Sequence, residues 1–299
     1  MKYFITLCLI STLVQAQVTE QHYIVYNTRT QQITNLDAII SEMQNYDVLF
    51  FGEEHNDSVG HYLEAQLLEK MFASYGAQTA LSMEMFDRDV QDVMDEYLAG
   101  LIKEKQFAKD ARTWSNYRDY RPMVEFAKTN HIPVVCANAA SRYSSLAVRK
   151  GMQGLMALPE ASKSYLAPLP FDTASGAYYD KLVDVFTGHD TTMTAASVSA
   201  NGMNMIMGQS TWDATMAWSI AEYLKENKGD KVFQVNGRFH SDERYAVVTQ
   251  LHNYRPKARS LVISSGSDEN FPNIDWSQHK QNGDYIIITD PKVPRTYEE

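Results

Sequence analysis

Two short peptides, about 185 residues apart, share one pattern of chemically active residues. They are Gly52-Glu53-Glu54-His55 and Gly237-Arg238-Phe239-His240, and each follows a hydrophobic run typical of a buried β-strand. A glycine at the end of a strand allows a sharp turn, so a histidine three residues later can project over the edge of the sheet. In open α/β sheets, ligands bind at this edge. The paired motifs therefore predict a functional site.

Two kinds of chemistry suit the polar residues at these predicted strand ends. Another predicted strand ends at Glu84, so the edge would carry His55, His240, Glu84 and Glu53. The two imidazoles and Glu84 could bind a divalent metal ion. The same groups could instead perform acid-base catalysis on a water molecule without a metal. Arg238 would suit an anionic group of a ligand.

Each of these residues also has a purely structural interpretation. A histidine after a strand is commonly a hydrogen-bonded structural residue, and a carboxylate such as Glu84 at the end of a buried strand needs a partner in any case. His61 lies near the start of a predicted helix, which favours a structural or supporting role over metal ligation.

A second group of candidate ligands lies in the later part of the chain. Tyr178, Tyr179 and His189 fall in a segment with Met203, Met205 and Met207. Tyrosine or histidine can bind haem iron within an apolar wall. The alternative is that these residues only pack the core, because methionine commonly fills irregular gaps there.

Composition and charge restrict the class of protein. The chain has 299 residues, of which 44% are hydrophobic and 21% charged, with a formal net charge of −10. These values are ordinary for a globular protein, and without a basic stripe we expect no nucleic-acid binding. Residues 1–16 resemble a secretory signal peptide cleaved after Ala16, which predicts a secreted or periplasmic protein. Cys8 lies within its apolar stretch, so lipidation is not expected, and Cys136 alone cannot form an intramolecular disulfide.

The order of predicted elements indicates the fold class. Strands at residues 48–51, 79–83, 134–137 and 232–235 alternate with helices at 59–75 and 122–130, except between residues 141 and 226, where only helices are predicted. This pattern predicts an α/β fold with a mostly parallel sheet flanked by helices and a helical insertion. The expected domains are an α/β domain at residues 17–142 and 210–299 and a helical insertion subdomain at residues 143–209.

Several motifs resemble one known family. They are Gly52-Glu53-Glu54-His55-Asn56-Asp57, Glu84-Met85-Phe86, the segment from Gln209 to Ala217 that contains Trp212-Asp213, and Asn236-Gly237-Arg238-Phe239-His240. Together they resemble the ChaN-like haem-binding uptake proteins of the Tiki/TraB/erythromycin-esterase superfamily. The Trp-Asp-x-x-Met-Ala segment is the most family-specific match, whereas the Gly-x-x-His pair marks only the superfamily.

The resemblance implies a fold, a ligand and partners. For ChaN-like proteins it implies haem binding at the bacterial cell envelope in iron uptake, with homodimerisation and outer-membrane uptake components as partners. For Tiki-like relatives it implies metal-dependent peptide hydrolysis. By match, His55, Glu53, Glu84 and His240 correspond to the superfamily centre, and no matched motif contains an iron-ligating tyrosine.

We therefore expect a haem-binding protein, with haem as the cofactor and Tyr178, Tyr179, His189 and Arg238 as candidate contacts. The alternative is a metal-dependent or water-activating hydrolase, of peptidase or esterase type, that uses the paired Gly-x-x-His motifs. A former enzyme site reused for binding would join the two hypotheses.

Overall fold

The computed structural model describes residues 18–187 and 195–298, and for residues 195–204 it describes only the backbone. The predicted signal peptide and His189 lie outside the described residues, so both stay predictions. Within the described ranges, no helix has the length and apolar character needed to cross a membrane.

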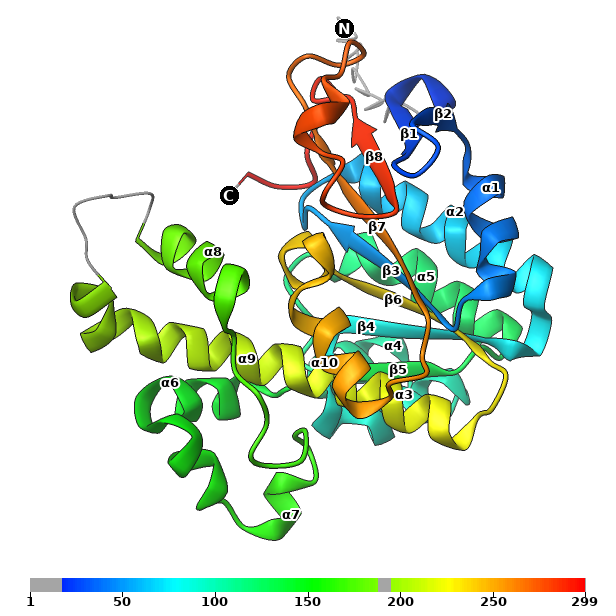
Figure 1. The fold of residues 1–299 in the computed structure, drawn as a ribbon. Coiled ribbons are helices and arrows are strands. Elements are labelled where there is room, and N and C mark those ends of the chain that lie inside the picture. Colours follow the sequence, from blue (N-terminus) through cyan, green and yellow to red (C-terminus); the bar gives the residue numbers. More distant parts are fainter. Residues whose placement is uncertain (1–17, 188–194, 299) are drawn as a thin grey trace, which may run out of the picture.

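One mixed sheet of eight strands forms the centre of the molecule (Figure 1). Its order is β2-β1-β8-β7-β3-β6-β4-β5, and the six strands from β8 to β5 are parallel, while β1 runs antiparallel to β2 and β8. The predicted α/β fold with a mostly parallel sheet is confirmed. The strands are β1 (Tyr23–Asn27), β2 (Gln32–Thr34), β3 (Val48–Glu53), β4 (Thr79–Asp87), β5 (Val134–Asn138), β6 (Lys231–Gly237), β7 (Ser260–Ser267) and β8 (Tyr285–Thr289).

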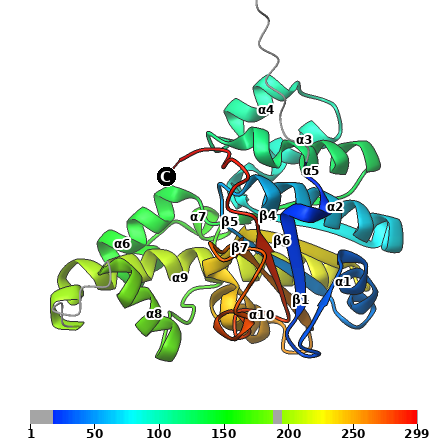
Figure 2. The ribbon, with the colours of Figure 1, turned by 90° about the horizontal axis from the view of Figure 1, so that it is seen from above.

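Helices cover both faces of the sheet, as Figure 2 shows from above. The side chains of β3 explain why, because Leu49 and Phe51 face one core while Val48 and Phe50 face the other. A strand buried on both faces is apolar at every position rather than at alternate ones. The helices are α1 (Leu36–Glu42), α2 (Ser58–Tyr75), α3 (Gln91–Leu98), α4 (Glu104–Asp110), α5 (Tyr117–Asn130), α6 (Ser141–Met156), α7 (Glu160–Lys163), α8 (Gly176–Phe186), α9 (Ala195–Glu226) and α10 (Ala246–Tyr254).

Different helices pack against the two faces of the sheet. Helices α1, α2, α3 and α5 contribute to the core that contains Leu49 and Phe51. Helices α9 and α10 contribute to the core on the opposite face, with Val48 and Phe50. Each fully buried phenylalanine contributes about 1.5–3 kcal/mol relative to an exposed one, so this double packing holds the end of β3 firmly in place.

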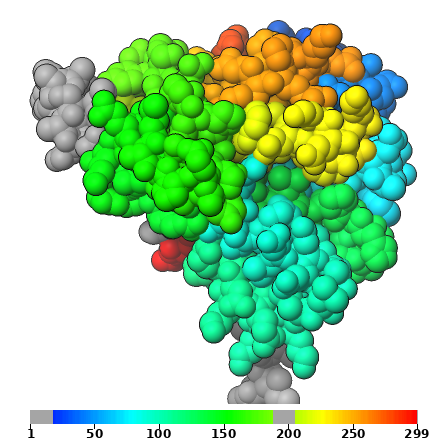
Figure 3. Space-filling model, turned by 90° about the horizontal axis from the view of Figure 1, so that it is seen from below, coloured from blue at the N-terminus to red at the C-terminus, as the bar shows by residue number. Residues whose placement is uncertain are grey.

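A helical lobe made of α6, α7, α8 and the first part of α9 extends beside the sheet. Figure 3 shows its green surface next to the teal part of the chain that contains α3 and α4. Its own core includes Tyr143, Leu155 and Phe171. Helix α9 runs without interruption from this lobe to the face of the sheet. The predicted domain boundary at residue 210 therefore falls within one continuous helix, and the division into domains stays a prediction.

The two Gly-x-x-His motifs lie on neighbouring strands. Strands β3 and β6 are paired in parallel, and Glu53 lies opposite Gly237 in the register. Both motifs therefore emerge at the same edge of the sheet, as the sequence pattern predicts.

The two motif glycines, Gly52 and Gly237, are required for a different reason from the turn that the sequence suggests. Neither Gly52 nor Gly237 has a positive φ angle, so neither supplies an unusual turn. A Cβ atom at Gly52 would lie 2.8 Å from the Cα of Arg238, and one at Gly237 would lie 2.7 Å from Nε2 of His55. The glycines are needed because the two motifs approach each other closely.

Candidate functional site

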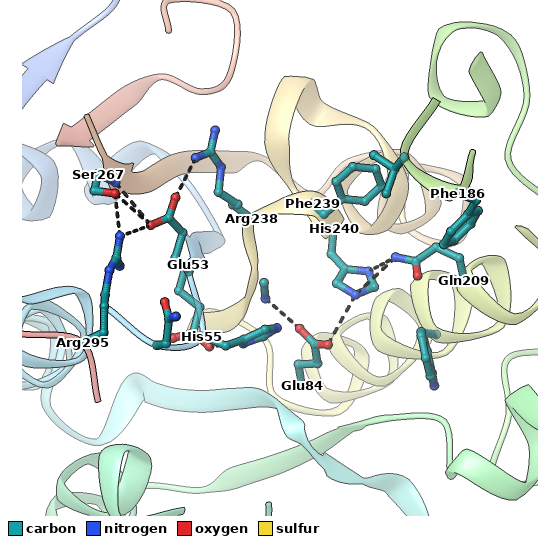
Figure 4. Close-up of a pocket in the computed structure, with 15 residues that line it drawn as sticks. Glu53, His55, Glu84, Phe186, Gln209, Arg238, Phe239, His240, Ser267 and Arg295 are labelled. Atoms are coloured by element: carbon teal, nitrogen blue, oxygen red, sulfur yellow. Dashed lines mark hydrogen bonds and ion pairs between the residues drawn. The ribbon is translucent and has the colours of Figure 1, made fainter. Parts of the chain in front are cut away.

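A cavity of about 650 Å³ opens at the carboxyl ends of β3 and β6. It lies between the edge of the sheet and helices α8 and α9, and its polar residues include His55, Glu84 and His240 (Figure 4). Glu84 lies near the carboxyl end of β4, and its neighbours Met83 and Met85 pack in the core that contains α2. Because side chains alternate along a strand, Glu84 points to the opposite face, where the cavity lies. Asn138, which also ends a strand, does not line the cavity.

His240 is buried and held by two carboxylates from distant parts of the chain. Its Nδ1 atom lies 2.6 Å from Oδ1 of Asp213 on α9, and its Nε2 atom lies 3.3 Å from Oε1 of Glu84. The other oxygen of Glu84 accepts a hydrogen bond from the backbone N–H of Gly237 at 2.7 Å. The hydroxyl of Tyr178 donates to Oδ2 of Asp213 at 2.8 Å, so four side chains form a connected polar chain.

Burial and neighbouring charges have opposite effects on the pKa values of Glu84 and His240, and the charges dominate in both cases. Burial favours the neutral form of Glu84, but His240, His55 and the Gly237 N–H outweigh it and lower the pKa of Glu84 to about 2. Burial also favours neutral His240, but Glu84 and Asp213 outweigh it and raise the pKa of His240 to about 10. At neutral pH, His240 is therefore an imidazolium paired with ionised Glu84.

His55 is the more exposed imidazole of the two. Its Nδ1 atom lies 2.8 Å from Oε1 of Glu53, and the hydroxyl of Tyr120 donates to the same oxygen at 2.8 Å. The backbone carbonyl of His55 accepts a hydrogen bond from Asn116. The ring extends towards Glu84, so that in Figure 4 the Glu84 carboxylate lies between the two imidazoles.

The pKa values of Glu53 and His55 are both raised. Burial, followed by the nearby Glu64 carboxylate, raises the pKa of Glu53 to about 8. For His55, burial acts to lower the pKa, but Glu53 and Glu84 overcome it and raise the pKa to about 9. These shifts arise from charges packed together with little water, which is a common property of functional sites.

Two arginines lie on another side of the cavity. Arg238 contacts Oδ2 of Asp242 through Nε at 3.0 Å and Oε1 of Glu54 through Nη1 at 3.3 Å. Arg295 contacts Oε2 of Glu54 at 2.9 Å, and its Nη1 atom has no hydrogen-bond partner in the described part of the chain. Both arginines line the cavity and carry N–H groups suited to carboxylates.

An apolar wall faces these charged groups. It is formed by Val185 and Phe186 of α8, Trp212 of α9, and Phe239. In Figure 4, Phe186 and Phe239 lie near His240 and Gln209. An apolar surface with a few directed polar groups is the usual composition of a binding site for an organic ligand.

The predicted tyrosines occupy other positions. Tyr178 and Tyr179 both lie on α8, but neither lines this cavity. Tyr178 lies behind His240, where it holds Asp213, and it lines a second hollow of about 480 Å³. Tyr179 packs in the same small hydrophobic cluster as Tyr178. Their role in haem binding stays a prediction.

The predicted metal ligands do not form one compact group. His55, His240 and Glu84 line the same cavity. Among the described residues, however, the group of His, Cys, Asp and Glu side chains whose ligand atoms lie within 4.8 Å of one another is Glu53, His61 and Glu64.

Several residues of the site are absent from the sequence-based prediction. Asp213 and Gln209 contact His240 from α9, and both lie in the matched segment from Gln209 to Ala217, which is the signal that could have identified them. Tyr120 and Arg295 come from α5 and the C-terminal segment, and no motif indicates them.

Fold and site together define the class of this protein: a parallel α/β sheet whose paired Gly-x-x-His motifs meet at a cavity beneath a helical lobe. Residues 39–251, more than two thirds of the chain, match the model of the family "Haem-binding uptake, Tiki superfamily, ChaN". The chain belongs to this family.

Solved structures share the fold. One is ChaN of Campylobacter jejuni, which is described as binding haem cofacially; it is 14% identical, with a TM-score of 0.69 over 91% of this chain and 98% of that one. A mutant of the erythromycin esterase EreC is 8% identical, with a TM-score of 0.49 over 91% of this chain and 99% of that one. The type III effector HopBA1 is 12% identical, with a TM-score of 0.45 over 85% and 93% of the two chains. No curated protein matches the sequence significantly.

Proposed function

We propose that this protein binds haem in the 650 Å³ cavity and takes part in haem or iron uptake at the cell envelope. The observation that carries the proposal is the match of residues 39–251 to the haem-binding uptake family. The similar fold of Campylobacter jejuni ChaN, a cofacial haem binder, supports the same ligand.

The residues around the cavity fit haem. Its volume lies within the range of roughly 300–1,000 Å³ that is usual for organic ligands. Phe186, Trp212 and Phe239 offer an apolar surface to the porphyrin, and Arg238 and Arg295 offer N–H groups to its propionates. To form these ion pairs, the propionates would compete with Glu54, which both arginines contact.

We propose His55 as the iron ligand from the described part of the cavity. Both nitrogens of His240 face carboxylates, whereas His55 uses Nδ1 for Glu53 and has no hydrogen bond at Nε2 among the described residues. A histidine that ligates a metal commonly bonds a carboxylate through its other nitrogen. Because the raised pKa of His55 keeps both of its nitrogens protonated at neutral pH, iron would displace the Nε2 proton to solvent. Tyr178 would have to leave Asp213 to reach iron, and Tyr179 and His189 stay alternative ligands.

The place of action and the partners belong to the same proposal. The predicted signal peptide favours the periplasm or the exterior of a bacterial cell, where outer-membrane uptake components would supply haem. We also propose that the protein forms a homodimer. Light scattering with and without haemin measures the molar mass in solution, and the molar mass of a single chain under both conditions would reject the homodimer.

Uptake is tested by growth. A strain of the source organism that lacks this gene is grown with haemin or with inorganic iron as the sole iron source. We expect poor growth on haemin only, restored by the wild-type gene and by the exposed-histidine control His252→Ala but not by His55→Ala. Equal growth of the deletion strain on both iron sources would reject the uptake role.

Hydrolysis is the second candidate function, and the Glu84 carboxylate between two imidazoles favours it. Because the pKa of Glu84 is about 2 and that of His240 about 10, Glu84 could orient a water molecule while His240 donates a proton. A panel of peptide and ester substrates tests this function. Activity that disappears in both Glu84→Gln and His240→Gln would support it, and equal activity in these variants would reject it.

A further inference from the structure

A second polar cluster lies behind the cavity. Glu53 is at the end of β3, and His61 and Glu64 lie three residues apart on the inner face of α2. All three side chains are buried, with exposed fractions of 1%, 6% and 0%. Tyr120 of α5 packs its ring against that of His61, with the ring centroids 4.9 Å apart. The cluster is therefore enclosed by β3, α2 and α5.

The hydrogen bond of His61 indicates which of its nitrogens carries the proton. Nε2 lies 3.1 Å from the backbone carbonyl oxygen of His55. A carbonyl oxygen only accepts, so Nε2 must be the protonated nitrogen. In neutral His61, Nδ1 therefore presents a lone pair. That lone pair faces Oε2 of Glu53 at 3.3 Å and Oε2 of Glu64 at 3.2 Å.

Three electron-pair donors thus lie close together, because one ligand atom from each of Glu53, His61 and Glu64 lies within 4.8 Å of the other two. Oε2 of Glu53, which faces His61, is buried and has no hydrogen-bond partner in the described part of the chain, and the same holds for Oε1 of Glu64, the second oxygen of that carboxylate. Two buried carboxylates without sufficient partners are costly, and no lysine or arginine forms an ion pair with either among the described residues. The arrangement needs a positive charge at its centre, supplied either by a metal ion or by bound protons.

The spacing suits a small transition-metal ion. Ligand atoms at roughly 2.0–2.2 Å from a tetrahedral metal lie about 3.3–3.6 Å apart, close to the two N···O distances of 3.3 and 3.2 Å. Calcium takes six to eight oxygen ligands at roughly 2.3–2.6 Å, which this cluster does not offer. A donor set of one imidazole and two carboxylates suits Zn²⁺ and its first-row neighbours.

We propose that Glu53, His61 and Glu64 bind a divalent first-row metal ion, with Zn²⁺ as the best fit. Two carboxylates and a neutral imidazole would make the complex electrically neutral. The carbonyl of His55 supports the ligating imidazole from behind, as outer partners of metal-bound histidines usually do. This site is separate from the predicted trio of His55, His240 and Glu84.

The proposed metal would also influence the cavity. Glu53 directs Oε2 towards the cluster and Oε1 towards His55 and Tyr120. One carboxylate would therefore connect the buried ion to the imidazole that faces the cavity. The metal proposal itself does not depend on haem binding, because its evidence is the contacts among Glu53, His61 and Glu64, of which only Glu53 also lines the cavity.

Metal content of the full mature chain tests the proposal. Protein without an affinity tag is purified without chelators, and its metals are measured by mass spectrometry. We expect about one ion per chain in the wild type and less than about one tenth in Glu64→Gln, which keeps the shape of the side chain. The matched control is Glu69→Gln, an exposed glutamate of the same helix, which should retain the ion.

A refolding experiment covers the case in which Glu64→Gln does not fold. Because the site is buried, the ion should enter during folding. Wild-type protein refolded with Zn²⁺ should unfold at a higher temperature than protein refolded with chelator. Two results would overturn the proposal: wild-type protein that is metal-free with the same Tm under both conditions, so that protons occupy the cluster, or full metal content in folded Glu64→Gln.

Discussion

At the scale of residues, the site depends on close approach between the two motifs. His55 and His240 reach the same cavity because Gly52 and Gly237 carry no Cβ atom that would collide with Arg238 and His55, respectively. The sequence pattern correctly predicts that both histidines and Glu84 share one edge. It attributes the glycines to backbone turns, however, whereas their φ angles are ordinary and the reason is steric. Such a contact between residues far apart in the chain has no local signal.

Substitution of Gly237 should displace His55. In Gly237→Ala, the new Cβ would lie 2.7 Å from Nε2 and 3.0 Å from Cε1 of that ring. Such overpacking costs about 1–3 kcal/mol of stability, and we expect haemin affinity to fall at least about tenfold. Urea unfolding and haemin titration measure the two effects.

The matched control for this substitution is Gly60→Ala. A Cβ at Gly60 would approach Asp57 no closer than 3.4 Å, and alanine is favoured over glycine within a helix. Stability and affinity close to wild type are expected for it. If Gly237→Ala behaves like this control, the motifs do not approach each other as described.

The pH dependence of stability should reveal the charged state of His240. Its pKa is raised from 6.5 to about 10 in the folded protein. The stability this adds is therefore fully present below pH 6.5 and is lost as the pH rises through 10. Loss of one linked proton gives a slope of up to about 1.4 kcal/mol per pH unit.

We predict that the stability difference between wild type and His240→Gln narrows between pH 7 and pH 10. Glu53, whose raised pKa of about 8 also reduces stability as the pH rises, is present in both proteins. The contribution of Glu53 is therefore common to both proteins and cancels in the stability difference. Urea unfolding at several pH values measures the difference, and His252→Gln is the exposed control. A difference that stays constant with pH would mean that His240 is neutral.

At the scale of elements, the alternation of strands and helices in the sequence predicts most of the sheet. Apolar runs that are buried on both faces, such as residues 48–51 of β3, can be recognised from the sequence of one strand alone. Helix limits are less accurate: α2 begins at Ser58 rather than Val59, and α5 begins at Tyr117, so that Pro122 lies inside it rather than at its start. The matched segment from Gln209 to Ala217 marks α9 as important, but its contact with His240 could not be predicted, because that contact depends on how the helix packs across the sheet.

The contact between α9 and the site should be important for stability. Asp213 bonds His240 and Tyr178 at the same time. In Asp213→Ala, a buried cation and a buried hydroxyl lose their partner, and removal of one member of a buried ion pair costs about 3–5 kcal/mol. We expect a loss of this size in the free energy of unfolding.

Asp180→Ala on the adjacent helix α8 is the control for this loss. Asp180 is exposed, so its substitution should change stability by no more than about 0.5 kcal/mol. Chemical denaturation measures both variants. A small effect in Asp213→Ala would show that α9 does not hold His240.

At the scale of the whole molecule, the cavity forms where the sheet edge meets the helical lobe. The sheet supplies His55, Glu84 and His240, and helices α8 and α9 supply most of the apolar wall. The family-specific residues Trp212 and Asp213 on α9 therefore lie beside the superfamily motifs: Trp212 lines the cavity, and Asp213 contacts His240. Arg295, close to the end of the described chain, completes the polar side.

The most direct test of haem binding is a haemin titration of residues 17–299, followed by the Soret absorbance. Wild-type protein and the exposed control His252→Ala should show a saturable change with a defined stoichiometry. His55→Ala should bind at least about tenfold more weakly, because it lacks the proposed iron ligand. The absence of a saturable change in the wild type would contradict haem binding. Unchanged affinity in His55→Ala would contradict the assignment of His55 as the iron ligand.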